Sequence, residues 1–348
     1  MASNEDLLSL LSLEPWFFTY STLCFSLKLI LFLPVMYVIT TQSPPSMESY
    51  KFYLFINVIS TSTWGVLLFI TQPMIVAPSL IVCSSGFLRT ISSLYFRSSI
   101  AALAFVYMSH IASTFTCLLF QYVHLRMSTM RKYFYQYSKA FIGYIFVTTI
   151  LSMPLIYAVF ESHYSANPSI SWLLEDNPNL NPSIVVYLLE SHPSCFKLDL
   201  YENIIFLAIS MSVIGFFLLF IFVYIHSNIL KFFFLKHAFV SKRTEMMQWN
   251  LYKFILIQSF CIIVFYLFPV LYIIISIAFK AKNLSIGFSF ALSIISSYEL
   301  SNFILILTYV GPYRQFLIKT FRRFFFKKQS SVISVSSTVA MVSSATAQ

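Results

Sequence analysis

Seven apolar segments, each long enough to cross a lipid bilayer as a helix, recur along this chain. A hydrocarbon core about 30 Å thick needs roughly 20 apolar residues in a helix. The segments cover residues 16–40, 52–70, 100–123, 140–160, 203–225, 251–278 and 286–310. The composition agrees, because 58% of the 348 residues are hydrophobic and 10% are charged, whereas soluble domains carry about 25% charged residues. The sequence therefore predicts an all-α protein built as a seven-transmembrane helix bundle.

The basic residues indicate how the bundle is oriented in the plasma membrane. Lys and Arg concentrate in the loops after the third and fifth segments and in the tail after the seventh, whereas the first 14 residues contain Glu5, Asp6 and Glu14 and no basic residue. Cytoplasmic loops carry the excess of Lys and Arg. We therefore expect a multi-pass protein with its N-terminus outside and its tail in the cytoplasm. The net charge of +10 is then a sign of orientation and of contact with membrane lipids, and we expect no nucleic-acid partner.

The chain carries no enzyme signature, and we expect no catalytic residue, no cofactor and no bound metal. Its six histidines are scattered, and its six glycines form no phosphate-binding loop. A seven-helix protein of this orientation is a receptor, a transporter or a channel. Transporters carry internal repeats and helices broken by Gly and Pro, and no repeat is visible here. A receptor is therefore favoured, with a small-solute transporter or a ligand-gated channel as the alternative.

Three side chains in the apolar segments are candidates for special roles. Lys28 and Glu299 lie about a dozen residues into the first and seventh segments, so we expect a buried ion pair between them, since unpaired charges in a bilayer are costly. The alternative is that Lys28 reaches the interface and Glu299 is protonated, each alone. His110 in the third segment is expected to be a hydrogen-bonded core residue, with ligand contact as the second possibility.

Cys83 and Cys195 are the only cysteines expected outside the membrane. The extracellular side is oxidising, so we expect a disulfide between the long outer loop and the approach to the third segment. Residues 74–88, which include Pro78 and Gly86, are expected to form an outer loop with a short re-entrant or interfacial piece.

Six basic residues at the inner ends of the helices are expected to dock a cytoplasmic partner. They are Arg126, Arg131, Lys132, Lys242, Arg243 and Arg314. Beyond the seventh segment, residues 312–328 have an apolar face and a basic face, which predicts an amphipathic eighth helix on the membrane surface. Around the receptor domain, 16–311, we expect a short extracellular N-terminus, 1–15, and a disordered Ser/Thr-rich tail, 329–348.

Two short motifs resemble those of nematode serpentine chemoreceptors of class H, or of the related class I, in the Str superfamily. The stretch 41–47, TQSPPSM, followed by Tyr50 and Lys51, resembles the first inner loop of class H. Residues 311–316, GPYRQF, look like the signature at the end of the seventh helix. Ser241 to Thr244 and Gln258 also occupy places where the family has similar features. The resemblance implies a chemosensory receptor that detects a small molecule, signals through a heterotrimeric G protein and resides in sensory cilia.

Overall fold

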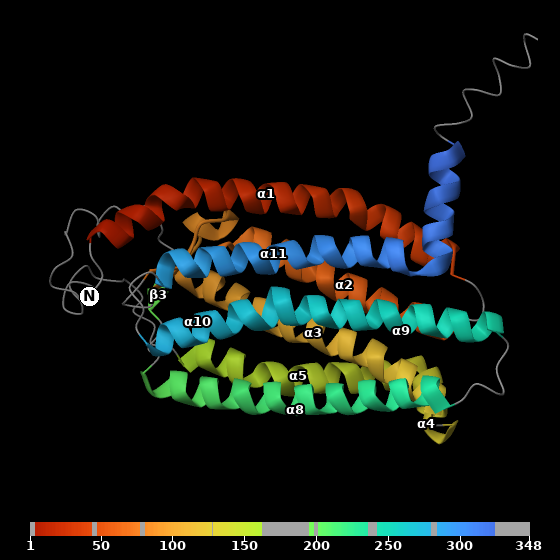
Figure 1. The fold of residues 1–348 in the computed structure, drawn as a ribbon. Helices are drawn as coiled ribbons and strands as arrows, with labels where there is room; N and C mark the ends of the chain where they lie inside the picture. The colour runs from red at the N-terminus through yellow and green to blue at the C-terminus, as the bar shows by residue number, and fades with distance from the viewer. Residues whose placement is uncertain are drawn as a thin grey trace, which may run out of the picture.

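The computed structural model is a bundle of long helices with a small β-sheet at one end (Figure 1). The residues that it describes are 4–43, 47–76, 81–126, 128–161, 195–197, 201–235, 242–279 and 284–323. The α-helices are α1 (Asn4–Thr41), α2 (Glu48–Thr71), α3 (Ser93–Arg126), α4 (Ser128–Tyr135), α5 (Tyr137–Glu161), α8 (Tyr201–Leu235), α9 (Lys242–Ile262), α10 (Phe268–Ala278) and α11 (Leu284–Tyr309). The strands are β1 (Pro73–Val76), β2 (Ile81–Ser84) and β3 (Phe196–Lys197), and the short helical segments are η2 (Phe87–Thr90) and η3 (Ile263–Leu267). The predicted tail, 329–348, and Pro78 lie outside the described residues.

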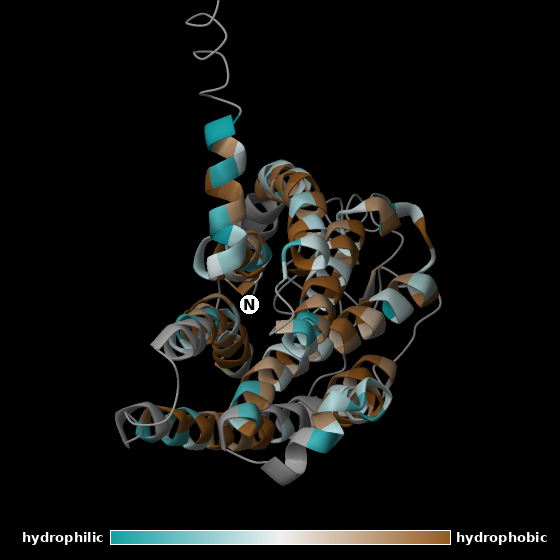
Figure 2. Cartoon of the chain, turned by 90° about the vertical axis from the view of Figure 1, so that its right-hand side faces the viewer, coloured by the Kyte–Doolittle hydropathy of each residue, from teal (hydrophilic) through white to brown (hydrophobic). Residues whose placement is uncertain are grey.

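Seven helical spans within the described chain are long and apolar enough to cross a membrane. They are Ser12–Thr41, Glu48–Thr71, Leu94–His124, Tyr137–Phe160, Val213–Lys231, Tyr252–Ser276 and Leu284–Tyr309. Figure 2 looks along the bundle and shows mostly hydrophobic, brown ribbon on these helices. The predicted class, a seven-transmembrane helix bundle, is confirmed. The helices extend beyond the predicted segments at several ends, since polar residues can continue a helix after the apolar run stops.

The sixth span changes its winding midway. It consists of α9, the π-helical segment η3 and α10 in direct succession. The N–H of Phe268 donates to the carbonyl of Ile263, five residues earlier, instead of four. Pro269 follows directly and has no N–H to donate, which accounts for the local change in the backbone hydrogen-bond pattern of the helix. π-Helical turns of this kind are frequent at functional sites, and this one carries the buried side chain of Tyr266.

A three-stranded antiparallel sheet covers one end of the bundle, which we call the sheet end. β1 pairs with β2, from Pro73 opposite Ser84 to Val76 opposite Ile81. β2 then pairs with β3, with Ile81 opposite Lys197. Within the described residues of the stretch 74–88, the paired strands β1 and β2 and the short helix η2 stand in place of a re-entrant helical piece, and the interfacial location of the stretch stays a prediction. A β-hairpin satisfies its backbone groups by strand pairing, so it needs no helical insertion into the bilayer.

The buried core consists of two apolar clusters with a polar layer between them. Trp64, Phe96, Tyr266 and Tyr298 belong to the cluster at the sheet end. The cluster at the opposite end contains Tyr53, Leu54, Phe254, Phe303 and Tyr313. Buried polar residues occur along α2, α3, α9 and α11 where the chain passes from one cluster to the other. They include Asn57, Thr61, His110, Ser113, Thr114, Gln258 and Asn302.

Residues 311–323 are helical and turn away from α11 across the end of the bundle (Figure 1). Two contacts attach this helix to α1 and to Ser43, two residues beyond the end of α1. The Tyr313 and Ser43 hydroxyl oxygens are 2.7 Å apart, and the ring centroids of Phe316 and Tyr37 are 5.9 Å apart. Hydrophilic and hydrophobic residues alternate along it in Figure 2. The last residues of the predicted eighth helix, 324–328, lie outside the described residues.

Candidate functional site

Three side-chain amides form the centre of the polar layer. Gln258 Nε2 donates to Asn302 Oδ1 at 2.9 Å and to Asn57 Oδ1 at 3.2 Å, and Asn302 Nδ2 also donates to Asn57 Oδ1 at 3.2 Å. Asn57 Nδ2 donates to the hydroxyl oxygens of Ser113 and Thr114, at 3.0 and 2.8 Å. This amide network joins α2, α3, α9 and α11. In apolar surroundings such bonds meet no competing water, so the network holds the helices in one arrangement. Gln258 Oε1 is buried and has no hydrogen-bond partner among the described residues.

His110 connects the amide network to the aromatic residues that lie nearer the sheet end. Thr61 Oγ1 donates its only proton to the backbone carbonyl of Asn57 at 2.7 Å. It must therefore accept from His110 Nδ1, which lies 2.9 Å away. These partners assign the Nδ1–H tautomer to His110 and leave Nε2 as an acceptor. His110 Nε2 is buried, and within the described part of the chain it has no hydrogen-bond partner.

An aromatic group surrounds His110 on the side toward the sheet end. The His110 ring centroid lies 5.1 Å from that of Tyr298 and 5.6 Å from that of Tyr266. Tyr266 and Tyr298 meet edge to face, with centroids 4.7 Å apart, which is a favourable aromatic geometry. Tyr107 and Trp64 complete the group, at 5.4 and 6.3 Å from Tyr266. The π-helical turn therefore places Tyr266 at the centre of the group.

Polar atoms in this group are buried without hydrogen bonds. Trp64 Nε1 and Tyr266 Oη have no partner among the residues that the structure describes, and the same holds for Glu299 Oε1. Leaving a buried donor or acceptor unpaired costs about 1–3 kcal/mol, so such atoms call for an explanation. Together with His110 Nε2 they define the candidate ligand site, which consists of Trp64, His110, Tyr266 and Glu299.

Lys28 and Glu299 lie together beside this site. Lys28 Nζ is 3.1 Å from Glu299 Oε2, and the two side chains are 7% and 1% exposed. Lys28 Nζ also donates to Ser296 Oγ at 3.4 Å. Gly65 on α2 makes room for the carboxylate, since a Cβ at this position would overlap Glu299 Oε2. The structure therefore brings the two predicted intramembrane charges into one ion pair that joins α1 to α11.

Gln72 marks the junction between α2 and the sheet. It adopts a φ of 34° in the left-handed region, which costs a non-glycine residue about 1–2 kcal/mol. Its backbone carbonyl accepts from Ser85 N and Ser85 Oγ, each at 3.0 Å. Its side-chain amide is buried and, as far as the described residues extend, unpartnered. A disulfide joins Cys83 on β2 to Cys195 next to β3, with Cα atoms 4.2 Å apart, so the sheet is covalently closed over this end.

The predicted docking residues all belong to elements at the end opposite the sheet (Figure 1). Arg126 is the last residue of α3, and Arg131 and Lys132 lie in α4. Lys242 and Arg243 begin α9, and Arg314 lies in the helix 311–323. Lys132 and Arg314 are exposed; the side chains of the other four lie outside the described ones. The structure thus gathers the six positions at one end of the bundle.

Neither the amide network nor Trp64 and Tyr266 of the candidate ligand site were predicted from the sequence, whereas His110 and Glu299 were named there. The signal was present, since Asn57, Gln258 and Asn302 are isolated amides in otherwise apolar segments. Arg97 was missed as well: it is 7% exposed near the start of α3, and its Nε donates to the Val159 carbonyl at 2.6 Å. In the described ranges, no three His, Cys, Asp or Glu side chains are grouped closely enough to hold a metal ion.

Comparison with known families extends over nearly the whole chain. The family model described as serpentine type 7TM GPCR chemoreceptor Srh matches residues 14–323. The match begins at the start of the first transmembrane span, Ser12–Thr41, and ends with the helix 311–323. No curated protein matches the chain. The family resemblance inferred from the two short motifs is confirmed.

Proposed function

Because the chain belongs to the Srh family of serpentine type 7TM GPCR chemoreceptors, we propose that it detects a small molecule and signals through a heterotrimeric G protein. The small molecule binds at the candidate ligand site. The observation that carries this proposal is the set of buried atoms there, Trp64 Nε1, His110 Nε2 and Tyr266 Oη, for which no described residue provides a hydrogen-bond partner. A ligand that pairs with them recovers the hydrogen bonds that folding left unmade.

The residues of the site favour a neutral, mainly apolar ligand with a hydroxyl or carbonyl group. Trp64 Nε1 can only donate, His110 Nε2 accepts in the tautomer assigned above, and the Tyr266 hydroxyl can do either. The surrounding aromatic rings offer apolar surface. Glu299 already has Lys28 at 3.1 Å, so a cationic ligand meets a carboxylate whose charge is compensated.

The route to the cytoplasmic partner runs through the amide network. A ligand bonded to His110 Nε2 acts on the ring whose Nδ1 donates to Thr61 Oγ1, and Thr61 Oγ1 also accepts from Asn302 Nδ2 of the amide network at 3.3 Å. Gln258 lies in the same helical span as Tyr266. A shift of Tyr266 on ligand binding therefore also moves Gln258, which belongs to the amide network. A ligand with different affinities for two arrangements of the network shifts their populations. The receptor sits in the plasma membrane of sensory cilia with its N-terminus outside, so the six basic positions face the G protein.

A ligand screen with two readouts tests this proposal. Cells that express the receptor are exposed to a panel of small volatile and water-soluble compounds, and G-protein activation and ionic current are recorded together. We expect a compound that activates the G protein without a receptor-dependent current. A compound that evokes current or its own uptake without G-protein activation would support the channel or transporter alternative.

Two variants then locate the ligand. Tyr266→Phe removes only the hydroxyl at the candidate ligand site, and Tyr224→Phe removes a hydroxyl from an exposed tyrosine, 54% accessible, on α8. Losing one hydrogen bond of about 1–2 kcal/mol predicts a roughly 5- to 30-fold higher half-maximal concentration for Tyr266→Phe. Tyr224→Phe should leave it unchanged. Equal potency of both variants and the unsubstituted receptor would place the ligand elsewhere.

A further inference from the structure

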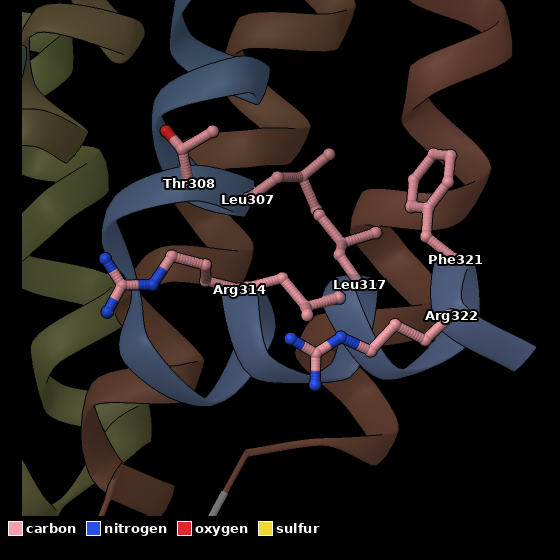
Figure 3. A pocket seen from close by; sticks show the side chains of 7 residues that line it. Leu307, Thr308, Arg314, Leu317, Phe321 and Arg322 are labelled. Atoms are coloured by element: carbon pink, nitrogen blue, oxygen red, sulfur yellow. The ribbon is translucent and has the colours of Figure 1, made fainter.

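We propose that the groove between the end of α11 and the helix 311–323 binds one phospholipid whose headgroup carries more than one phosphate. The groove is open on one side and has a volume of about 620 Å³. Leu307 of α11 and Leu317 and Phe321 of the following helix provide its apolar wall, and Arg314 and Arg322 are at its rim (Figure 3). It lies at the end of the bundle opposite the candidate ligand site.

The groove is shaped by the turn between α11 and the following helix. The Tyr313–Ser43 and Phe316–Tyr37 contacts attach the helix to α1, so the groove is part of the folded receptor. In Figure 3 the side chains of Leu307 and Leu317 point toward each other, and the Phe321 ring lies on the same upper side of the view. Phe321 is nevertheless 60% exposed. An exposed apolar wall at the membrane surface suits an acyl chain, which packs against such side chains without ordering water.

The two arginines place their guanidinium groups beside the groove, whose own lining is almost entirely apolar. Both are exposed, and Figure 3 shows the Arg314 guanidinium at the left and the Arg322 guanidinium lower and nearer the centre, both below Leu307. No Asp or Glu follows Glu299 in the sequence, so this segment carries no carboxylate to neutralise them. Arginine binds phosphate through two parallel N–H bonds. An apolar wall beside two uncompensated arginines matches a lipid, which presents acyl chains and phosphate side by side.

The spacing of the arginines selects among anionic lipids. Arg314 and Arg322 are eight residues apart, which is about 12 Å along a helix at 1.5 Å per residue. In Figure 3 the two guanidinium groups also lie well apart, so in this arrangement one phosphate group cannot take a bidentate contact from each. A phosphoinositide, whose inositol ring bears further phosphates beside the one in its diester, can satisfy both. Phosphatidylserine has one phosphate and should bind less well.

Native mass spectrometry of the purified full-length receptor tests the site. The receptor is reconstituted in phosphatidylcholine nanodiscs that contain phosphatidylinositol bisphosphate or, separately, phosphatidylserine, and retained lipids are counted. We expect one saturable bisphosphate lipid per receptor and weaker retention of phosphatidylserine. Equal retention of the two lipids would overturn the proposed headgroup. The assay contains no agonist and no G protein, so its result is independent of the proposed signalling function.

A matched pair of double variants separates a built site from general attraction of basic residues to anionic lipid. Arg314→Gln/Arg322→Gln removes the two groove arginines, and Lys319→Gln/Arg323→Gln removes the same charge from the same helix outside the groove lining. The groove variant should bind roughly 20- to 30-fold more weakly, or about 1 kcal/mol for each arginine. The control variant should lose no more than a few-fold. Equal losses would overturn the site, and single Arg→Gln variants give the same comparison if a double variant fails to fold.

Discussion

Lys28 on α1 and Glu299 on α11 form an ion pair inside the transmembrane bundle, with 3.1 Å between Nζ and Oε2. The two residues are 271 positions apart in the sequence, and both side chains are almost fully removed from the surface. Their pairing joins the first and last transmembrane helices and places the carboxylate next to Gly65 of α2. Breaking a buried pair by removing one partner is strongly destabilising, because the other charge is left uncompensated.

A charge swap tests the energetic role of this pair. Lys28→Glu and Glu299→Lys each place two like charges together, and each should lower surface expression severely, at a cost of about 3–5 kcal/mol. The double swap restores opposite charges and should recover most of the expression, measured by surface labelling of an extracellular tag. A double swap as poor as the combined single variants would show that the two residues do not depend on each other.

The more exposed pair Glu14–Arg89 provides the control for the swap. Its atoms are 3.5 Å apart, and its side chains are 15% and 38% exposed. Exposed ion pairs contribute about 0–1 kcal/mol. Reversing either of these charges should therefore change expression only slightly.

Gly65→Ala should destabilise the receptor through the same pair. The added methyl group overlaps the Glu299 carboxylate, so either the carboxylate leaves Lys28 or α2 moves away from α11. Overpacking of this kind costs about 1–3 kcal/mol, and it should appear as a lower thermal denaturation temperature of the detergent-solubilised protein. Gly143→Ala is the control, because a Cβ there meets nothing within 4 Å. Equal denaturation temperatures for the two variants would contradict the close packing at Gly65.

Asn57→Ala should weaken the attachment of four helices at once. It leaves Gln258 and Asn302 each without one of their amide partners, at a cost of about 1–3 kcal/mol for each unpaired buried group. Ser62→Ala is the control on the same helix, since the Ser62 hydroxyl donates only to the Val58 carbonyl within α2. The Asn57→Ala and Asn302→Ala effects should also be non-additive. Additive losses of stability would argue that the amides act independently.

Substitution of either half-cystine should have the same effect as substitution of both. Cys83→Ser, Cys195→Ser and the double variant each open the disulfide, and each should lose about 2–5 kcal/mol of stability. Cys24→Ser, at a free cysteine in α1, should cost less. Peptide mapping of the non-reduced receptor should recover the linked pair. Recovery of both thiols alkylated in folded protein from the cell surface would refute the bond.

Reversing the charges of Arg131 and Lys132 should abolish signalling. Both lie in α4, at the end of the bundle that we assign to the G protein. The Arg131→Glu/Lys132→Glu receptor should reach the surface in normal amounts and bind ligand, because Lys132 is exposed and outside the core. G-protein activation in response to a ligand from the screen is the measurement. Unchanged activation at normal surface expression would place the docking surface elsewhere.

The sequence alone determined the class of this protein and the number of its spans. Lipid offers no hydrogen bonds to the backbone, so a chain with seven apolar runs of about 20 residues has to cross the membrane as helices. Short motifs at 41–47 and 311–316 were enough for the family. The structure brings parts of them together, since Ser43 and Tyr313 share a hydrogen bond.

Tertiary structure decided which residues of the spans face one another. Apolar periodicity is weak where every face of a helix is apolar, so the sequence could not determine the rotation of each helix about its axis. Asn57, Gln258 and Asn302 were visible as isolated amides, but only the packing of α2, α9 and α11 brings them within 3.2 Å of each other. The strand pairing of Ile81 with Lys197 was equally hidden, because each strand is short and its partner is more than a hundred residues away. Contacts between distant segments depend on how all the helices pack at once, and no local pattern encodes that.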